Sequence, residues 1–278
     1  MSSGILPIGS ALLKGGDVVL HNLADLTLEC TPGIYQGGPP GGPPAYFPHA
    51  DWRRTRSVTP SPVATQQPAS PLSRAVTTVC VGPDAVELAR RRLLPALSGG
   101  AVEERRAALE HVRTSIENLL SRNYGIRCRE RGPADCVVNR PGLISTAFDF
   151  DSGHFVGLHI DNHQRFPVHR RDSSQILFAV NIGFSHRYLI FAPWTVRGML
   201  SRLGKPTESR SEDTDSVSLK EEYLSAFPRE PLFRIRLEPG DAYLCAPQNL
   251  IHDGATNDSG SADVALLMSG DYAWSQSR

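Results

Sequence analysis

A series of short apolar segments in the C-terminal half constrains the fold of this 278-residue chain more than any other feature. The segments are rich in β-branched and aromatic residues and are separated by turn-forming residues, which is the pattern of β-strands. Strands at this spacing favour an all-β jelly roll or barrel in this half. The predicted strands are ISTAFDF (144–150), HFVGLHI (154–160), QILFAVNIGF (175–184), RYLIFAPW (187–194), PLFRIRL (231–237), AYLCAP (242–247), LIHDGA (250–255) and DVALLMSGDYAW (263–274).

Helical periodicity precedes these strands. Residues 84–97 predict a short amphipathic helix that ends near Pro95, because proline disrupts a helix interior. Residues 101–123 place apolar side chains on one face at helical spacing, so this helix is expected to pack against a sheet. The predicted fold is α+β, with a jelly-roll or cupin-like core over about 140–274 and the helices of 84–124 packed on it.

The N-terminal region, residues 1–75, is predicted to be an extension of a single catalytic domain that covers residues 76–278. Residues 17–30 favour an edge strand or a short helix. Ten of the 22 prolines lie in residues 32–71, together with two Gly-Gly-Pro-Pro runs, so regular structure is not expected there. This segment is either a flexible linker or an ordered arm anchored by its aromatic side chains, Tyr35, Tyr46, Phe47 and Trp52. The polar residues 204–222 predict a surface loop, which leads into a short helix, YLSAF.

Composition excludes several classes of partner. Basic and acidic residues both number 29, so the formal charge is zero and no basic excess indicates a nucleic acid or an anionic membrane as partner. No apolar run approaches the length of a membrane-spanning helix, and the N-terminus lacks the basic start of a secretory signal. The five cysteines have no C-x-x-C spacing, which fits reduced thiols. We therefore expect a cytoplasmic protein of undetermined oligomeric state.

The stretch GLHIDNH (157–163) carries metal-binding side chains where a buried strand would need only apolar ones. Alternate residues of a strand point to the same face, so His159 and Asp161 are expected to project together. Two histidines and one carboxylate form a face that binds non-heme iron(II) and leaves coordination positions open. His252, in the segment PQNLIHDGA, is the predicted third ligand.

This combination resembles the C-terminal half of the iron(II)- and 2-oxoglutarate-dependent oxygenases. Members of that superfamily carry H-x-D on an early strand of a double-stranded β-helix, and a distal histidine after a Pro-Gly-Asp turn. Here the corresponding elements are His159 and Asp161, the turn at 239–241, and His252. The resemblance covers residues 144–272 and implies iron(II) and 2-oxoglutarate as cofactors, with His159, Asp161 and His252 as catalytic metal ligands.

The chain departs from that family pattern at the residue that holds 2-oxoglutarate. Many members hold its far carboxylate with an arginine that follows the distal histidine, but residues 253–268 contain no arginine or lysine. Some branches supply the basic group from a strand that follows H-x-D. Arg187 is the predicted residue for this role, since a guanidinium binds a carboxylate through two parallel hydrogen bonds. Asn181 is predicted to donate to the same ligand.

The resemblance implies an oxygenase that uses dioxygen on a small molecule, such as an amino acid or a natural-product intermediate. Related halogenases replace the carboxylate ligand with a small residue, so Asp161 favours hydroxylation, desaturation or ring formation over halogenation. A charged loop at 212–215 could attract a cationic substrate, or Arg165, Arg170 and Arg171 could bind a carboxylate, and the sequence does not separate the two. The alternative functions are a cupin-like metal dioxygenase or isomerase that does not use 2-oxoglutarate, and a non-enzymatic β-sandwich binding module.

Overall fold

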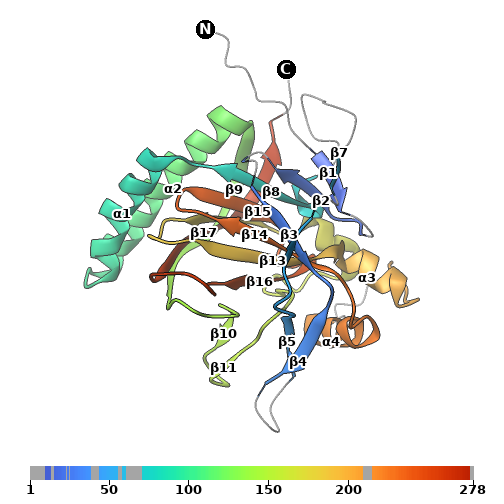
Figure 1. The fold of residues 1–278 in the computed structure, drawn as a ribbon. Coiled ribbons are helices and arrows are strands. Elements are labelled where there is room, and N and C mark those ends of the chain that lie inside the picture. Colours follow the sequence, from blue (N-terminus) through green and yellow to red (C-terminus); the bar gives the residue numbers. More distant parts are fainter. Residues whose placement is uncertain are drawn as a thin grey trace.

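A computed structural model describes residues 10–13, 16–22, 24, 26–38, 44–55, 58–60, 71–208 and 215–275. Most of the strands form two sheets that face each other (Figure 1). The eight-stranded sheet has the order β7 (Val58–Pro60), β1 (Ser10–Leu13), β2 (Val19–Asn22), β8 (Ala75–Cys80), β15 (Asp241–Cys245), β12 (Ile176–Asn181), β17 (Asp263–Trp274), β9 (Ile126–Asn139). The five-stranded sheet has the order β16 (Leu250–Ala255), β13 (Arg187–Thr195), β14 (Leu232–Leu237), β3 (Leu28–Thr31), β6 (Arg53–Arg54).

An apolar core lies between the two sheets because alternate residues of each strand point inward. On β13, Leu189 and Phe191 join this core, whereas Ile190 packs on the outer face of the same strand. On β15, Tyr243 and Cys245 point between the sheets. Both faces of these central strands are buried, which explains why their sequences are almost continuously apolar.

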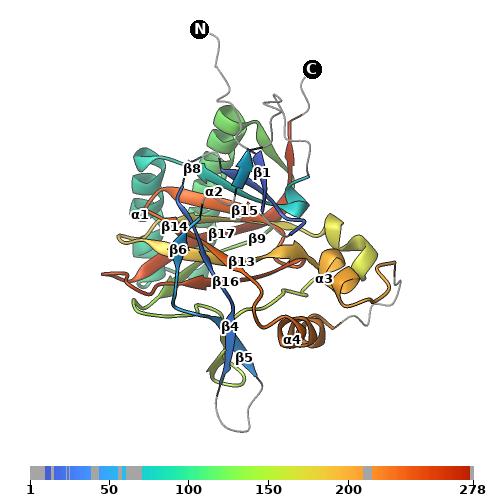
Figure 2. The same ribbon diagram turned by 45° about the vertical axis from the view of Figure 1, so that its right-hand side comes forward.

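Helices cover the outer faces of both sheets (Figures 1 and 2). The helices α1 (Pro83–Leu97) and α2 (Val102–Tyr124) pack on the eight-stranded sheet through a cluster that includes Leu93, Val112 and Ile116. The helices α3 (Val196–Arg202) and α4 (Ser216–Ala226) pack on the five-stranded sheet. Short 3₁₀ helices occupy Leu72–Arg74 and Val168–Ser173. The predicted α+β class, with helices packed on a jelly-roll core, is therefore confirmed.

The N-terminal region supplies strands to both sheets. Strand β2 lies parallel to β8, and β3 lies antiparallel to β14. A separate hairpin, β4 (Ile34–Gly37) and β5 (Ala45–Pro48), reaches the far end of the sheets, where the Tyr46 hydroxyl lies 3.1 Å from Ser225 Oγ of α4. Of the two alternatives for residues 32–71, the described part is an ordered arm.

The predicted helix over residues 84–97 is confirmed as α1, which begins at Pro83 and contains Pro95 in its last turn. Two other predicted boundaries were wrong. The predicted surface loop at 204–222 contains most of α4, which begins after Asp215 caps its first turn through the amides of Val217 and Ser218. The predicted strands 144–150 and 154–160 reduce to the short hairpin β10 (Phe148–Asp149) and β11 (His154–Phe155).

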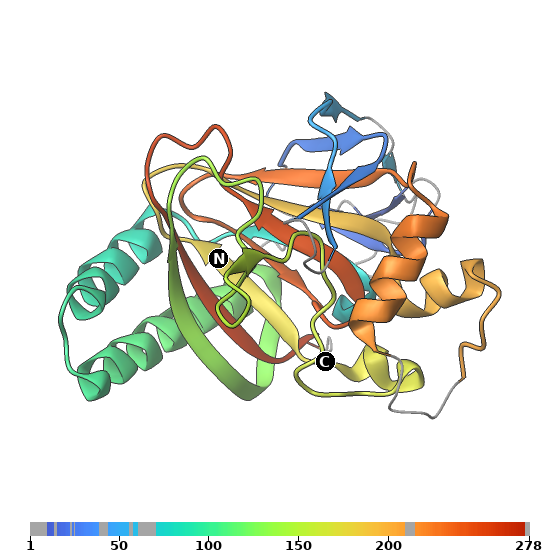
Figure 3. The same cartoon turned by 90° about the horizontal axis from the view of Figure 1, so that it is seen from below.

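The 14-residue strand β9 was not predicted, because its first part, IRCRERGPAD, lacks the apolar residues of a buried strand. It is an edge strand that pairs along its length with β17, so its polar side chains remain in water. Figure 3 views the molecule from below, where the segment between β9 and β12 crosses in front of the strands. Among the described helices, none is long and apolar enough to cross a membrane.

Candidate metal centre

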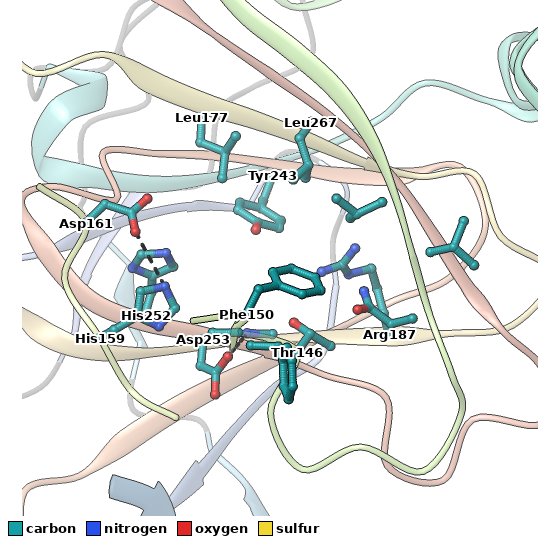
Figure 4. A pocket seen from close by; sticks show the side chains of 16 residues that line it. Thr146, Phe150, His159, Asp161, Leu177, Arg187, Tyr243, His252, Asp253 and Leu267 are labelled. Atoms are coloured by element: carbon teal, nitrogen blue, oxygen red, sulfur yellow. Dashed lines mark hydrogen bonds and ion pairs between the residues drawn. The ribbon is translucent and has the colours of Figure 1, made fainter. Parts of the chain in front are cut away.

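The structure brings His159, Asp161 and His252 together (Figure 4). One potential ligand atom from each of the three side chains lies within 4.8 Å of the other two. His159 is in an extended segment that pairs with the edge of the five-stranded sheet. Its amide donates to the His252 carbonyl at 3.0 Å, and the His252 amide donates back to the His159 carbonyl at 2.9 Å. This reciprocal pair places the two imidazoles side by side, with their centroids 4.4 Å apart.

Backbone hydrogen bonds orient both imidazoles. Nδ1 of His159 lies 2.8 Å from the Gly157 carbonyl, and Nδ1 of His252 lies 3.4 Å from the Leu250 carbonyl. A carbonyl can only accept, so the Nδ1 atoms carry the protons and the Nε2 lone pairs remain for a ligand. Nε2 of His159 is 3.5 Å from Asp161 Oδ1. Two neutral imidazole nitrogens and one carboxylate, open to a pocket, fit iron(II).

Arg171 stabilises the segment that carries Asp161 through hydrogen bonds to backbone carbonyls. Its buried guanidinium donates from Nη1 to the carbonyls of Asp161, at 3.2 Å, and Gln248, at 3.0 Å. Burial lowers the pKa of Arg171 below its ordinary value. Arg165, Arg170 and Arg171 do not line the pocket beside the three ligands. Of the predicted acidic loop, residues 212–214 lie outside the described residues, and Asp215 caps α4.

Burial shifts the pKa of two adjacent residues in opposite directions. Burial, followed by the neighbouring His159, lowers the pKa of His252 to about 4. Burial raises the pKa of Asp253 to about 6, although His159 and the hydroxyl of Ser145 act in the opposite direction. His252 is therefore neutral at physiological pH, which is the form that binds a metal ion.

A cavity of about 470 Å³ opens beside the three ligands. Most of its wall is apolar, and it extends between the two sheets from the metal-binding group to Arg187 (Figure 4). The cavity is lined by Val137, Val138, Asn139, Thr146, Ala147, Phe148, Phe150, His159, Asp161, Leu177, Arg187, Tyr243, His252, Asp253, Gly254 and Leu267.

Arg187 is buried in this cavity at the start of β13, with 5% of its surface exposed. Its Nη1 lies 3.3 Å from Asp263 Oδ2, in an ion pair whose carboxylate is fully buried. Neither Nε nor Nη1 of Arg187 makes a hydrogen bond to a described residue. Gly254 leaves room for Thr146 and for the guanidinium, because a Cβ at that position would lie 2.3 Å from Thr146 Oγ1 and 3.0 Å from Nη2 of Arg187.

Asn181 lies outside the cavity wall. Its amide nitrogen donates to the carbonyls of Ser185 and Leu237, both at 2.9 Å, and its oxygen accepts from the Gly183 amide. Asn181 therefore holds the turn between β12 and β13 together. Its three hydrogen bonds are all internal to the fold.

Several residues of the cavity were not predicted from the sequence, among them Tyr243 and Asp253. Tyr243 lines the wall between the two sheets, and the alternation of β15 was a signal for its inward position. Asp253 follows His252 directly and lies beside it in Figure 4. Nothing in the sequence pattern distinguished Asp253 from a turn or surface aspartate.

No family model and no curated protein matches this chain. Among solved structures, a Kdo hydroxylase described as a non-heme Fe(II) α-ketoglutarate-dependent dioxygenase aligns, in its cobalt(II) complex, with a TM-score of 0.42 and 13% identity. The alignment covers 71% of this chain and 80% of that chain. Its complex with succinate and Fe(III) aligns with a TM-score of 0.40 and 12% identity. These values are too low to assign a family, so the functional assignment depends on this chain's own residues.

Proposed function

We propose that this protein is a non-heme iron(II)- and 2-oxoglutarate-dependent oxygenase that hydroxylates a small molecule. His159, Asp161 and His252 hold the metal ion. The observation that carries the proposal is the convergence of these three side chains within 4.8 Å, at the wall of a cavity large enough for a cosubstrate and a small substrate.

Arg187 is proposed to bind the far carboxylate of 2-oxoglutarate. Nε of this buried guanidinium lacks a hydrogen bond to the described residues, and Nη1 makes an ion pair with Asp263 but no hydrogen bond there. Such a guanidinium favours an anionic ligand, because unpaired buried donors are costly. Tyr243 lines the same wall, and its hydroxyl can donate to that ligand. Burial raises the pKa of Tyr243, so the phenol keeps its proton at physiological pH.

The residues of the site hold the metal ion in position and shield the reacting atoms from water. When bound, iron(II) and 2-oxoglutarate supply the chemistry by which dioxygen oxidises a C–H bond. The backbone carbonyls of Gly157 and Leu250 fix the ring orientations of the two histidines. Asp161 provides the carboxylate that hydroxylases keep and related halogenases lack. The apolar wall of the cavity limits the access of water to the reacting atoms.

A metal enzyme that does not use 2-oxoglutarate is the second candidate. It is favoured by the ion pair between Arg187 and Asp263, because this carboxylate already partly neutralises the guanidinium. In such an enzyme Arg187 would be structural, and the open metal positions would take the substrate and dioxygen directly.

Metal binding tests the site itself. Titration of the metal-free protein with cobalt(II) should give one tight site per chain, and His159→Ala, Asp161→Ala or His252→Ala should weaken it at least about a hundredfold. His111→Ala, which changes an exposed histidine of α2, is the matched control and should bind cobalt(II) like the wild type. Equal affinity in all four variants would contradict the assigned ligands.

Turnover of 2-oxoglutarate separates the two candidates. With iron(II) and dioxygen, the wild type should convert 2-oxoglutarate to succinate and carbon dioxide slowly even without substrate. Arg187→Met should raise the KM for 2-oxoglutarate about a hundredfold while cobalt(II) affinity stays within a few fold, since the variant removes a charged hydrogen bond away from the metal. Absence of succinate from a wild-type protein that binds cobalt(II) would favour the second candidate.

A further inference from the structure

Three of the eight large apolar side chains that are exposed among the described residues lie together at the mouth of the cavity. Phe150 is 89% exposed and Phe148 is 39% exposed, and both line the cavity. Val138, at the end of β9, is 57% exposed and lines the same wall. Large apolar side chains that stay in water beside a binding cavity mark a surface that a ligand covers.

The two phenylalanines stand in an edge-to-face arrangement. The ring centroids of Phe148 and Phe150 are 5.2 Å apart with an interplanar angle of 79°. Phe155, paired with Phe148 across the hairpin, also contacts the Phe148 ring edge to face, with its centroid 5.2 Å away and an angle of 71°. Rings at such angles leave faces and edges free, so a further ring can extend the same edge-to-face pattern.

The hairpin that carries these rings is part of the metal-binding segment. Strand β11 ends at Phe155, and His159 and Asp161 follow four and six residues later in the chain. Figure 4 shows the ring of Phe150 over the cavity, between the metal-binding group and Arg187 in this view. A group held by this hairpin is therefore presented to the metal-binding face.

The charges of the cavity disfavour an anionic substrate. Among the described residues of its wall, Arg187 is the only one with a permanent positive charge. It pairs with Asp263 and, in the proposed function, with the cosubstrate. The remaining charged groups of the wall, Asp161 and Asp253, are carboxylates.

We propose that Phe148 and Phe150 form a substrate-recognition wall that binds an aromatic ring or a similarly flat apolar group, on a substrate with no anionic group beside that ring. This inference depends on the proposed function, because the bound group is taken to be the substrate of the oxygenase. The wall itself is built from residues that do not bind the metal.

The test measures binding of two fluorinated probes by ¹⁹F NMR. 4-Fluorobenzyl alcohol represents the uncharged aromatic ligand, and 4-fluorobenzoate represents its anionic counterpart. The proteins are the wild type, the double variant Phe148→Ala/Phe150→Ala, the double variant Phe148→Leu/Phe150→Leu, and Phe184→Ala. Phe184 is 64% exposed and lies outside the cavity wall, so it is a matched control. Circular dichroism confirms that each variant is folded.

In the metal-free protein, the double alanine variant should raise the Kd of 4-fluorobenzyl alcohol at least about tenfold, since two ring contacts are lost. The double leucine variant should give a smaller rise, and Phe184→Ala should leave the Kd within twofold. With excess 2-oxoglutarate, 4-fluorobenzoate should bind the wild type at least about fivefold more weakly than the alcohol.

Three results would overturn the inference: no detectable binding of the alcohol by the wild type, equal affinity in the double alanine variant, or preferred binding of the benzoate. Because binding of the alcohol is measured without metal, its result is independent of the cobalt(II) titration. A protein that binds the probe through Phe148 and Phe150 but binds no cobalt(II) would contradict the proposed function and leave the aromatic wall intact.

Discussion

At the scale of single residues, His252 and Asp253 are sequence neighbours with opposite effects on stability. The folded-state pKa of His252 is lowered from 6.5 to about 4, so its contribution to stability is present above pH 6.5 and is lost as the pH falls towards 4. The folded-state pKa of Asp253 is raised from 3.8 to about 6, so its contribution is present below pH 3.8 and is lost as the pH rises through 6.

Between pH 6 and pH 4 these two contributions offset each other in the metal-free protein. Each amounts to about 3 kcal/mol, because one pKa unit corresponds to about 1.4 kcal/mol. Asp253→Asn removes one of them. We expect the unfolding free energy of this variant to fall about 1.4 kcal/mol per pH unit more steeply than that of the wild type as the pH decreases from 6 to 4.

Urea denaturation at a series of pH values checks this difference in slope. The comparison cancels the other titrating groups, which are common to both proteins. Parallel curves for the wild type and Asp253→Asn over pH 4–6 would show that Asp253 does not take up a proton on folding.

At the scale of elements, the N-terminal hairpin supports the segment that carries the first two ligands. The Leu158 amide donates to the Tyr46 carbonyl at 2.8 Å, and Gly157 forms a bridge with Tyr46 of β5. Gly157 has a φ of 70°, and a Cβ there would overlap the Tyr46 carbonyl oxygen. The close approach of these two chains therefore depends on glycine.

Gly157→Ala should weaken cobalt(II) binding at least about tenfold, because β5 and the segment of His159 must separate and His159 loses its orientation. Gly153→Ala is the matched control. Gly153 has a similar φ of 73°, but a Cβ there meets nothing within 4 Å, so this variant carries the backbone strain alone. We expect it to lose about 1 kcal/mol of stability and to keep its cobalt(II) affinity. Cobalt(II) titration and thermal unfolding measure the two effects, and equal cobalt(II) affinities in the two variants would contradict the role of Gly157.

At the scale of the whole molecule, the buried guanidinium of Arg113 links helix α2 to the larger sheet through hydrogen bonds. Arg113 of α2 is 1% exposed and bonds to Glu117 at 2.8 Å. It also donates to the carbonyl of Gly132 in β9, at 2.6 Å, and to that of Ser269 in β17, at 2.7 Å. One guanidinium therefore joins a helix and two strands on the face opposite the cavity.

Arg113→Met should lower the unfolding free energy by about 3–5 kcal/mol, because it leaves buried carbonyls and part of the Glu117 carboxylate without a donor. Arg106→Met changes an exposed arginine of the same helix and should alter stability by less than about 0.5 kcal/mol. Urea denaturation gives both values. The cobalt(II) affinity of the folded Arg113→Met protein should equal that of the wild type, and a loss would mean that this helix also shapes the metal centre.

Features that depend on local periodicity and spacing were predictable from the amino-acid sequence alone. The apolar runs predicted the central strands, and the helical period predicted α2. The spacing of His159 and Asp161 and the position of His252 after a Pro-Gly-Asp turn predicted three side chains that the structure brings within 4.8 Å. These predictions succeed because a side chain's direction within a strand or helix follows from the backbone repeat.

Which groups face each other across the fold became known from the three-dimensional structure. Arg187 meets Asp263, Asn181 bonds to the Leu237 carbonyl of β14 as well as within its own turn, and Phe148 and Phe150 stand at the mouth of the cavity. These contacts depend on strand order and register between segments far apart in the chain. The local sequence does not contain that information, because the same residues would meet other partners if the register shifted by one.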